Sequence, residues 1–592
     1  MPESPMRAAP LAFLVSIVLP AIAASQNLII NNLRGQTIAY EIPESEGRAV
    51  AIHYIEQIRD RFLPRVEIVD ATRMDDASLR AKLKGTLMLY TILSENSRLL
   101  RLAAQPLPFR IEGGTMHWAD LSAPARDLRV VFVGRHPYGD GYSVVYAAGS
   151  NALLARANDV FHGACSFHIF EGAEGRLLRE GFYDKTFSLK PDRLSLEDAN
   201  ADVREFFLTL EKNHPHLLAK VTKKDYEDLK QRTAREVKAR MGPDGKIGIE
   251  DLAYSLSYAA AFFQDGHTTI RWGQPVLNQN TTRGKRFPPF WLDSENGRLF
   301  VVSSNDPALN GTEILEVNGR PAADFLKPAL DRISAETRTY RTAIFVLNQA
   351  FWYYLTNVFS DETDSLKVRA IGGQTREQVV RTVDFADFQK LARPRKPSPR
   401  TQLDFFDDGR IARLVIPALV YGADRKKSEE VFDKAFDQIK ERQSSDLIID
   451  IRGNSGGDSR MGDYVLRFVH AGLAGKPESF FAGNTYMLTD HYVFSSAVMF
   501  ADAFRDYRAG TLIGYETGGT PSHYGYPRSF RLKNSGIELG VSRTHFNAPK
   551  PRPGDDRHGV LPDVPVTREL LVPYQGEADP VLSFTLAYIR KK

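Results

Sequence analysis

The strongest constraint on the fold is an alternation of apolar segments that begins at Ile411. The segment 447–451 is apolar at every position except Asp450, which predicts a short strand buried on both faces of a sheet. An amphipathic stretch at 428–442 precedes it, and further strand-like and helix-like stretches follow as far as Gly514. This order predicts repeated β-α units, and hence a mainly parallel sheet, within residues 401–592.

The whole chain of 592 residues is long enough for several domains, so we expect a multidomain α/β protein. Short β-rich runs, among them Ala49 to Tyr54 and Thr86 to Tyr90, alternate with helix-like stretches and predict an N-terminal α/β domain of unknown role at 25–186. Apolar residues at helical spacing then predict a helical module at 187–275. A strand-rich module follows at 276–400.

The strand-rich module contains two Asn-Gly pairs, at 310–311 and 318–319, which are typical of tight hairpin turns. The second pair lies in the sequence GTEILEVNGRP, which is similar to PDZ domains, modules that bind peptides by adding a strand to a sheet edge. A hairpin between two apolar strands explains the same residues. Both interpretations stay open.

The N-terminus predicts export. Residues 9–24 form an apolar run behind Arg7 that ends in small residues, as a cleavable signal peptide does. We expect residues 1–24 to be removed and the chain to be periplasmic or extracellular, with no stable membrane span; an uncleaved anchor helix is the alternative. The net charge of +4 comes from scattered basic residues, so nucleic acid is not an expected partner. A single cysteine excludes an intrachain disulfide.

Two serines compete as a nucleophile. Ser455 lies in Gly-Asn-Ser-Gly-Gly, which satisfies the G-x-S-x-G elbow of α/β-hydrolases, with His545 and His558 available downstream. Ser495 precedes an apolar helical face, and the start of a helix offers unpaired N–H groups and a positive dipole end that stabilise an oxyanion. An N-cap role alone also accounts for Ser495. The local sequence leaves these alternatives open.

Four segments in a fixed order add a resemblance: DLIIDIRGNSGG at 446–457, FSSA at 494–497, IGYETGG at 513–519 and GVLPDVPV at 559–566. Together they resemble the C-terminal processing proteases and the tricorn core protease, over roughly residues 190–590 of the sequence. The resemblance implies a crotonase-like β-α core and a serine peptidase acting on peptide or protein substrates. The metal-binding motif H-E-x-x-H and the phosphate-binding P-loop are absent, so no metal or cofactor is expected.

Carried over residue by residue, the resemblance implies Ser495 as nucleophile, with the backbone N–H groups of Ser496 and Gly456 as the oxyanion hole. His267, in Gln-Asp-Gly-His-Thr-Thr, matches the histidine of the tricorn-like branch, and an imidazole titrates near neutrality as a general base should. The orienting acid of a Ser-His-acid triad aligns best with Asp556. Asp555 is adjacent, and a polar turn is an equal explanation of both aspartates.

Two departures from the family pattern affect these expectations. Thr520 stands where the tail-specific branch has a lysine, which removes a Ser/Lys dyad, and Val498 stands where many relatives have a glutamate. Two alternatives therefore remain: a catalytically degenerate binding protein on the same scaffold, as in retinoid-binding relatives, and an α/β-hydrolase esterase that uses Ser455. The natural substrate, the cleavage specificity and the oligomeric state stay open.

Overall fold

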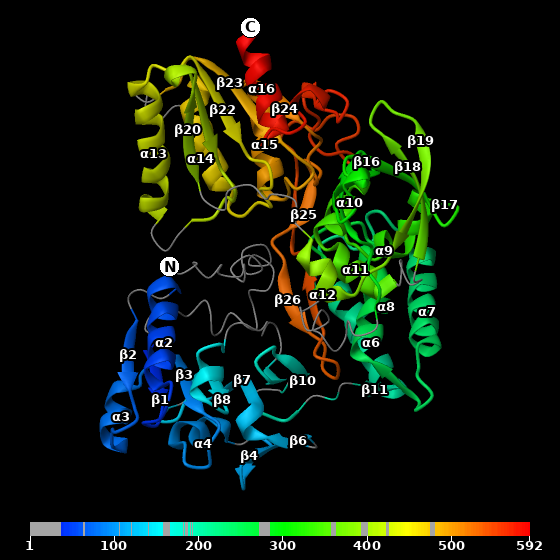
Figure 1. Cartoon of the computed structure of the whole chain (residues 1–592). Helices are drawn as coiled ribbons and strands as arrows, with labels where there is room; N and C mark the ends of the chain where they lie inside the picture. Colours follow the sequence, from blue (N-terminus) through cyan, green and yellow to red (C-terminus); the bar gives the residue numbers. More distant parts are fainter. Residues whose placement is uncertain are drawn as a thin grey trace.

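The computed structural model describes residues 37–592 except 63–65, 106, 120, 140, 158–165, 182, 184–186, 190, 192, 272–284, 357–362, 392–400, 422–424 and 474–479 (Figure 1). The predicted signal peptide at 1–24 lies outside the described residues. Among the helices that are described, none has the length and apolar character needed to cross a membrane.

The N-terminal part of the described chain is an α/β unit (blue to cyan in Figure 1). Its main sheet has the order β10-β9-β7-β8-β3-β1-β2, in which β8, β3, β1 and β2 run parallel. These strands are β1 (Thr37–Glu41), β2 (Glu67–Asp70), β3 (Leu87–Ile92), β7 (Leu128–Arg135), β8 (Tyr142–Ala148), β9 (Phe167–Glu171) and β10 (Arg176–Gly181). A small side sheet comprises β4 (Phe109–Glu112), β5 (Thr115–Trp118) and β6 (Leu121–Pro124), and the helices are α2 (Arg48–Phe62), α3 (Asp76–Lys82), α4 (Arg98–Ala104) and α5 (Asn151–Leu154).

One predicted strand in this unit is wrong. The run from Ala49 to Tyr54 lies in helix α2, where Ala51 and Ile55, four residues apart, are fully buried. The β-branched residues favoured a strand locally. The parallel pairing of β1 with β2 requires a crossover connection, however, and α2 supplies it.

A helical unit follows, as the sequence predicts. It contains α6 (Leu196–Asn213), α7 (Lys223–Ala239) and α8 (Ile249–Ala261), with a two-stranded ribbon of β11 (Arg193–Ser195) and β12 (Lys246–Gly248). Ser195 and Thr222 cap the first two helices through their side-chain oxygens. Buried apolar residues on facing sides of the helices form one core, including Phe206, Phe207 and Leu256.

The strand-rich unit has the sheet order β14-β15-β16-β18-β19, with β17 paired to β16. Its strands are β14 (Phe290–Glu295), β15 (Arg298–Ser304), β16 (Thr312–Val317), β17 (Arg320–Pro321), β18 (Thr363–Ala370) and β19 (Thr375–Arg381). Helices α9 (Ala322–Leu330), α10 (Arg338–Leu347), α11 (Gln349–Thr356) and α12 (Phe385–Lys390) complete the unit, and its core is separate from that of the helical unit.

The C-terminal unit is built on a six-stranded sheet in the order β20-β21-β22-β23-β24-β29, parallel except for β20. Its strands are β20 (Gln402–Phe406), β21 (Ile411–Val415), β22 (Asp446–Asp450), β23 (Asn484–Thr489), β24 (Thr511–Gly514) and β29 (Val564–Pro565). The helices are α13 (Arg425–Glu441), α14 (Ser459–Val469), α15 (Ser496–Asp506) and α16 (Pro580–Arg590). The predicted β-α alternation is confirmed here.

Both faces of this sheet are buried, which explains the continuously apolar strands. On β22, Leu447 and Ile449 pack in the core shared with α13, α14 and α15, whereas Ile448 packs in the core shared with α16. Successive side chains of a strand point to opposite faces, so both sets must be apolar. This sheet holds the carboxyl ends of its parallel strands at one edge, where the glycine turn 453–457 and the start of α15 lie.

A second small sheet joins the helical and C-terminal units. Strand β13 (Thr269–Arg271), which follows α8, pairs antiparallel with β27 (Glu538–Val541), and β27 pairs with β26 (Arg528–Arg531). Leu532, Ile537 and Leu539 are buried in the core of the helical unit. Strand β25 (His523–Gly525) precedes β26 in sequence and β28 (Thr544–Phe546) follows β27, and these two strands pair with each other. Residues 528–541 therefore extend from the C-terminal unit onto the helical one, which the sequence did not predict.

A buried charge network closes the end of β22. The Asp450 carboxylate is 2% exposed and accepts hydrogen bonds from the guanidinium groups of Arg413 and Arg452. Arg452 also bridges to Asp579, the N-cap of α16, at 2.7 and 2.9 Å. Because bidentate arginine pairs fix geometry as well as charge, this network ties α16 to the residue that precedes the glycine turn.

We therefore expect Arg452→Met to lower the free energy of unfolding of the C-terminal unit by about 3–5 kcal/mol, because it leaves a buried carboxylate undercompensated. Urea denaturation monitored by circular dichroism checks this. Lys390→Met, which removes an exposed i,i+3 pair with Asp387, serves as the control and should change stability by no more than about 0.5 kcal/mol. Equal effects of the two substitutions would contradict the expectation.

Candidate active site

Ser495 stands at the junction between the loop after β23 and helix α15. Its backbone has φ 53° and ψ −129°, a conformation that costs energy for a residue with a side chain. Its hydroxyl makes no cap hydrogen bond to the helix. Instead, the Oγ atom lies 3.0 Å from Nε2 of His267, within hydrogen-bonding distance. The side chain of Ser495 is therefore directed to the imidazole, and the N-cap interpretation is not the one the structure supports.

His267 comes from the turn between α8 and β13, 228 residues before Ser495 in sequence. Its backbone N–H donates to Asp265 Oδ1 at 2.9 Å, and its ring stacks on Phe494 with centroids 4.6 Å apart. The His523 ring also lies nearly parallel to the His267 ring, with centroids 5.8 Å apart. The pairing of β13 with β27 carries the turn to the C-terminal unit, and the two aromatic contacts fix the ring.

Burial lowers the pKa of His267 to about 4, although the negative charge of Asp265 acts in the opposite direction. The imidazole is thus neutral at pH 7 and able to accept a proton. Burial alone would raise the pKa of Asp265, but the hydrogen bond from His214 Nε2 at 3.1 Å and the nearby His267 hold it below its usual range. A buried carboxylate next to the imidazole favours the imidazolium that proton transfer would create.

The glycine turn lies against the nucleophile. A Cβ atom placed on Gly456 would fall 2.8 Å from the Phe494 oxygen and 2.9 Å from the Ser496 nitrogen, and the φ of Gly456 is +100°. The Ser496 hydroxyl donates to the Gly457 carbonyl at 2.8 Å, which holds the helix start to the turn. The structure therefore brings Gly456, Ser495 and Ser496 together, in a space that only glycine fits.

The two predicted oxyanion donors differ in their present state. The N–H of Ser496 makes no hydrogen bond within the part of the chain that the structure describes. The N–H of Gly456 donates to Oδ1 of Asn454 at 2.8 Å, and the Asn454 amide in turn donates to the Ile416 carbonyl. Gly456 would have to exchange the Asn454 oxygen for a substrate oxygen in order to act as a donor.

The competing nucleophile, Ser455, is exposed in the glycine turn. Within the described residues it makes no hydrogen bond to a histidine, and the motif around it forms the turn that contacts Ser495. The G-x-S-x-G match is therefore a feature of the turn and not an elbow with an assembled triad.

The structure does not bring Asp556 to the imidazole, and this prediction needs correction. The Asp556 side chain is 77% exposed and lies 3.7 Å from Arg557. Asp555 is buried, but its carboxylate accepts the Arg552 backbone N–H at 2.8 Å. The backbone carbonyl of Gly554 accepts the backbone hydrogen bonds that form the next part of the turn. These aspartates thus form the polar turn that was the alternative explanation, and the Nδ1 atom of His267 has no hydrogen-bond partner among the described residues.

Two acids near His267 were not predicted. Asp265 and Glu336 are buried, and one carboxylate oxygen of each lies within 4.8 Å of a ring nitrogen of His267 and of the other. Asp265 is part of the Asp-Gly-His sequence that identified the histidine, so its position carried a signal. Glu336, 69 residues further along the chain, carried none. The three groups are also the candidate metal ligands found among the described residues, but His267 Nε2 already faces Ser495 and Asp265 already faces His214.

The remaining family segments assemble as a unit around the same sheet edge. Thr517 accepts the Val560 N–H at 2.7 Å through its hydroxyl and donates its own N–H back to Val560, so the third and fourth segments are paired. Thr520 is buried and donates to the Ser522 carbonyl, and Val498 is fully buried against Gly519. Neither supplies a charged group to Ser495.

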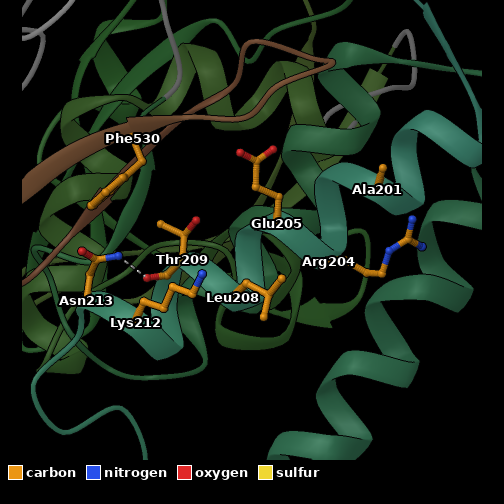
Figure 2. A pocket seen from close by; sticks show the side chains of 8 residues that line it. All are labelled: Ala201, Arg204, Glu205, Leu208, Thr209, Lys212, Asn213 and Phe530. Atoms are coloured by element: carbon orange, nitrogen blue, oxygen red, sulfur yellow. Dashed lines mark hydrogen bonds between the residues drawn. The ribbon is translucent and has the colours of Figure 1, made fainter.

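A surface hollow of about 470 Å³ lies away from these residues, along α6 and next to Phe530 of β26 (Figure 2). Its walls carry both charged and apolar side chains, and Asn213 in it is bonded to the Thr209 carbonyl. It contains none of the residues that surround Ser495.

A hydroxyl bonded to a neutral imidazole, at the start of a helix and beside a glycine turn, is the arrangement of a serine hydrolase. Residues 410–566 match the model of peptidase family S41, and the chain carries a domain of that family; it is a serine-type peptidase. His267 and Glu336 lie outside the matched residues.

Solved structures of low similarity accompany this match. Mature CPAF complexed with lactacystin is 14% identical, with 62% of this chain and 94% of that chain covered and a TM-score of 0.42. The photosystem II D1 C-terminal processing protease is 13% identical, with 63% of this chain and 94% of that chain covered and a TM-score of 0.32. The tricorn protease is 13% identical, with 78% of this chain and 43% of that chain covered and a TM-score of 0.33. These scores are too low to establish a shared overall fold. A comparison with curated protein sequences found no match.

The close approach of Gly456 to the nucleophile gives a first prediction for this site. We expect Gly456→Ala to lower the rate of reaction at Ser495 by about 10²-fold or more, because the methyl group displaces the turn that would hold an oxyanion. The rate of labelling by a fluorophosphonate probe measures it. Gly311→Ala is the matched control, since Gly311 also has a positive φ of +79° but open space around it. A normal labelling rate in Gly456→Ala would contradict the prediction.

The lowered pKa of His267 gives a second prediction for this site. Because the pKa is about 4, the base stays unprotonated in mild acid, and the labelling rate should be constant from neutral pH down to about pH 5. It should then fall as the pH passes through 4 and the ring takes up a proton. A pH profile of the labelling rate, with intrinsic fluorescence as the check on folding, tests this. Loss of reactivity near pH 6.5, where an ordinary histidine titrates, would show that the ring is more solvated than in the structure.

Proposed function

We propose that the chain is an exported serine endopeptidase that hydrolyses peptide bonds through an acyl-enzyme on Ser495, with His267 as the general base. The observation that carries the proposal is the 3.0 Å contact between Ser495 Oγ and His267 Nε2, made by a serine whose backbone is strained and whose side chain caps nothing. The peptidase S41 domain at 410–566 supports peptide or protein substrates. Export rests on the apolar segment at 9–24.

In this proposal His267 Nε2 takes the hydroxyl proton as Ser495 Oγ attacks the scissile carbonyl carbon. The oxygen of that carbonyl becomes negative and is stabilised by the free N–H of Ser496 and by the Gly456 N–H once it leaves Asn454. His267 then returns the proton to the leaving amine, and the acyl-enzyme forms. Water repeats the same steps, with His267 again as base, and releases the second product.

The proposal includes finer assignments of the fold. The five parallel strands β21, β22, β23, β24 and β29 support a crotonase-like catalytic core at 401–592. The division of the rest into 25–186, 187–275 and 276–400 stays a prediction. Separate cores support it, although the core of the helical unit also includes residues from 532–541. A PDZ-like role of the strand-rich unit stays a prediction.

We expect a fluorophosphonate probe to label the purified chain and the label to disappear in Ser495→Ala, while Ser455→Ala keeps it. Ser455 provides a matched control because it lies in the adjacent turn but is not bonded to His267. Tryptic mass spectrometry of the labelled protein should find the adduct on the peptide that contains Ser495.

The outcomes separate the alternatives. Labelling that survives Ser495→Ala and vanishes in Ser455→Ala would support the α/β-hydrolase esterase. Labelling of neither serine in a folded chain would support the degenerate binding protein, whose ligand binding should be unaffected by Ser495→Ala.

A further inference from the structure

The proposed base lacks a partner on one side of its ring. Nε2 of His267 faces Ser495, whereas the buried Nδ1 atom makes no hydrogen bond of good geometry among the described residues. The backbone of Tyr524 lies near enough to the ring to raise its pKa, against the larger effect of burial. A neutral imidazole that accepts a proton at Nε2 must carry its own proton on Nδ1, so an acceptor is needed there to hold the correct tautomer. A buried polar atom without a partner is uncommon enough to require an explanation.

Glu336 has a carboxylate oxygen that could accept this hydrogen bond. It lies just before α10 in the strand-rich unit, is 8% exposed, and accepts the Gly266 N–H at 3.0 Å through Oε1. Its other oxygen, Oε2, is buried and has no partner among the described residues. Gly266 immediately precedes His267, and a Cβ on Gly266 would fall 2.9 Å from Oε2. The absence of a side chain at 266 thus leaves the space in which this carboxyl group lies.

Asp265 is the other nearby acid, but its oxygens are already used. Oδ1 accepts the backbone N–H of His267 at 2.9 Å, and Oδ2 pairs with His214 Nε2 at 3.1 Å. Asp265 therefore fixes the turn and supplies negative charge. Of the two acids that each have a carboxylate oxygen within 4.8 Å of a ring nitrogen of His267, Glu336 is the one with an oxygen, Oε2, that has no partner in the described structure.

We propose that Glu336 is the positioning residue of His267, accepting a hydrogen bond from Nδ1–H while Nε2 exchanges its proton with Ser495. The inference rests on the proposed function and replaces Asp556 as the third member of the site. The acid then comes from the strand-rich unit. Three units, each with its own hydrophobic core, would contribute one residue each to the site: the C-terminal unit Ser495, the helical unit His267 and the strand-rich unit Glu336.

The surroundings of Glu336 give the proposal a pH signature. Burial, and then the charge of Asp265, raise the pKa of Glu336 well above its usual range, and Lys220 acts in the opposite direction. Tyr340 and Arg341 on α10 also interact with this carboxyl group. A protonated carboxyl group still accepts a hydrogen bond, but its ionised form stabilises an imidazolium more strongly. Reactivity should therefore rise a second time as the pH increases through the raised pKa of Glu336.

The test compares Glu336→Gln, Glu336→Asp and Glu377→Gln by the saturation kinetics of fluorophosphonate labelling at Ser495. In Glu336→Gln the amide oxygen can still accept the Gly266 N–H, which turns the NH₂ group toward Nδ1 and disfavours the correct tautomer. We expect its maximal labelling rate to fall about 10²-fold or more, with little change in probe affinity. The rise in reactivity at higher pH should disappear, and Glu336→Asp should restore part of the rate. Glu377→Gln, exposed on β19 in the same unit, should behave as the parent.

Thermal melting separates positioning from folding, since a loss of rate at an unchanged melting temperature supports the proposal. A parental rate and pH profile in Glu336→Gln would falsify it. So would a loss of rate in Asp556→Asn with none in Glu336→Gln, which leaves the serine peptidase function intact but assigns the acid to the 552–558 turn. Absence of labelling in the folded parent would overturn the function and this inference together.

Discussion

The candidate site depends on the antiparallel pairing of β13 with β27. Thr269, Ile270 and Arg271 pair with Gly540, Leu539 and Glu538, and the Thr268 hydroxyl accepts the Ser542 N–H at 3.1 Å. Strand β13 directly follows the turn that holds His267, so its pairing with β27 also positions that turn. The nucleophile lies at the start of α15, in a unit whose sheet has a core on each face, and the imidazole follows α8, which packs in a different core. A few backbone hydrogen bonds and the buried residues of 530–541 keep the hydroxyl and the ring in register.

Much of the C-terminal unit could be predicted because its strands are buried on both faces. A strand such as β22 has to be apolar throughout, and that pattern stands out from the amphipathic helices around it. The positions of Ser495, Ser496, Gly456 and His267 followed from segments that occur in a fixed order. Each of these features is formed by residues that are adjacent in sequence: a helix start, a glycine turn and an Asp-Gly-His turn. A short sequence segment is therefore enough to identify it.

The acid could not be predicted in the same way. Asp556 was chosen by alignment, but its turn satisfies its own polar groups and leaves the side chain in solvent. Glu336 has no surrounding motif, because its role would depend on a contact with Gly266 across two units. Helix α2 was missed for a related reason, since β-branched residues favour a strand locally whereas the parallel sheet requires a helix between its strands. Local sequence carries little information about such long-range demands.

The order of the parts along the chain has a consequence for synthesis. The imidazole is made 228 residues before the hydroxyl, and the strand that fixes it, β27, is made only after both. A partly synthesised chain can fold its first units without possessing an assembled hydroxyl–imidazole pair. The β13–β27 pairing therefore cannot position the imidazole until residues 538–541 have been synthesised.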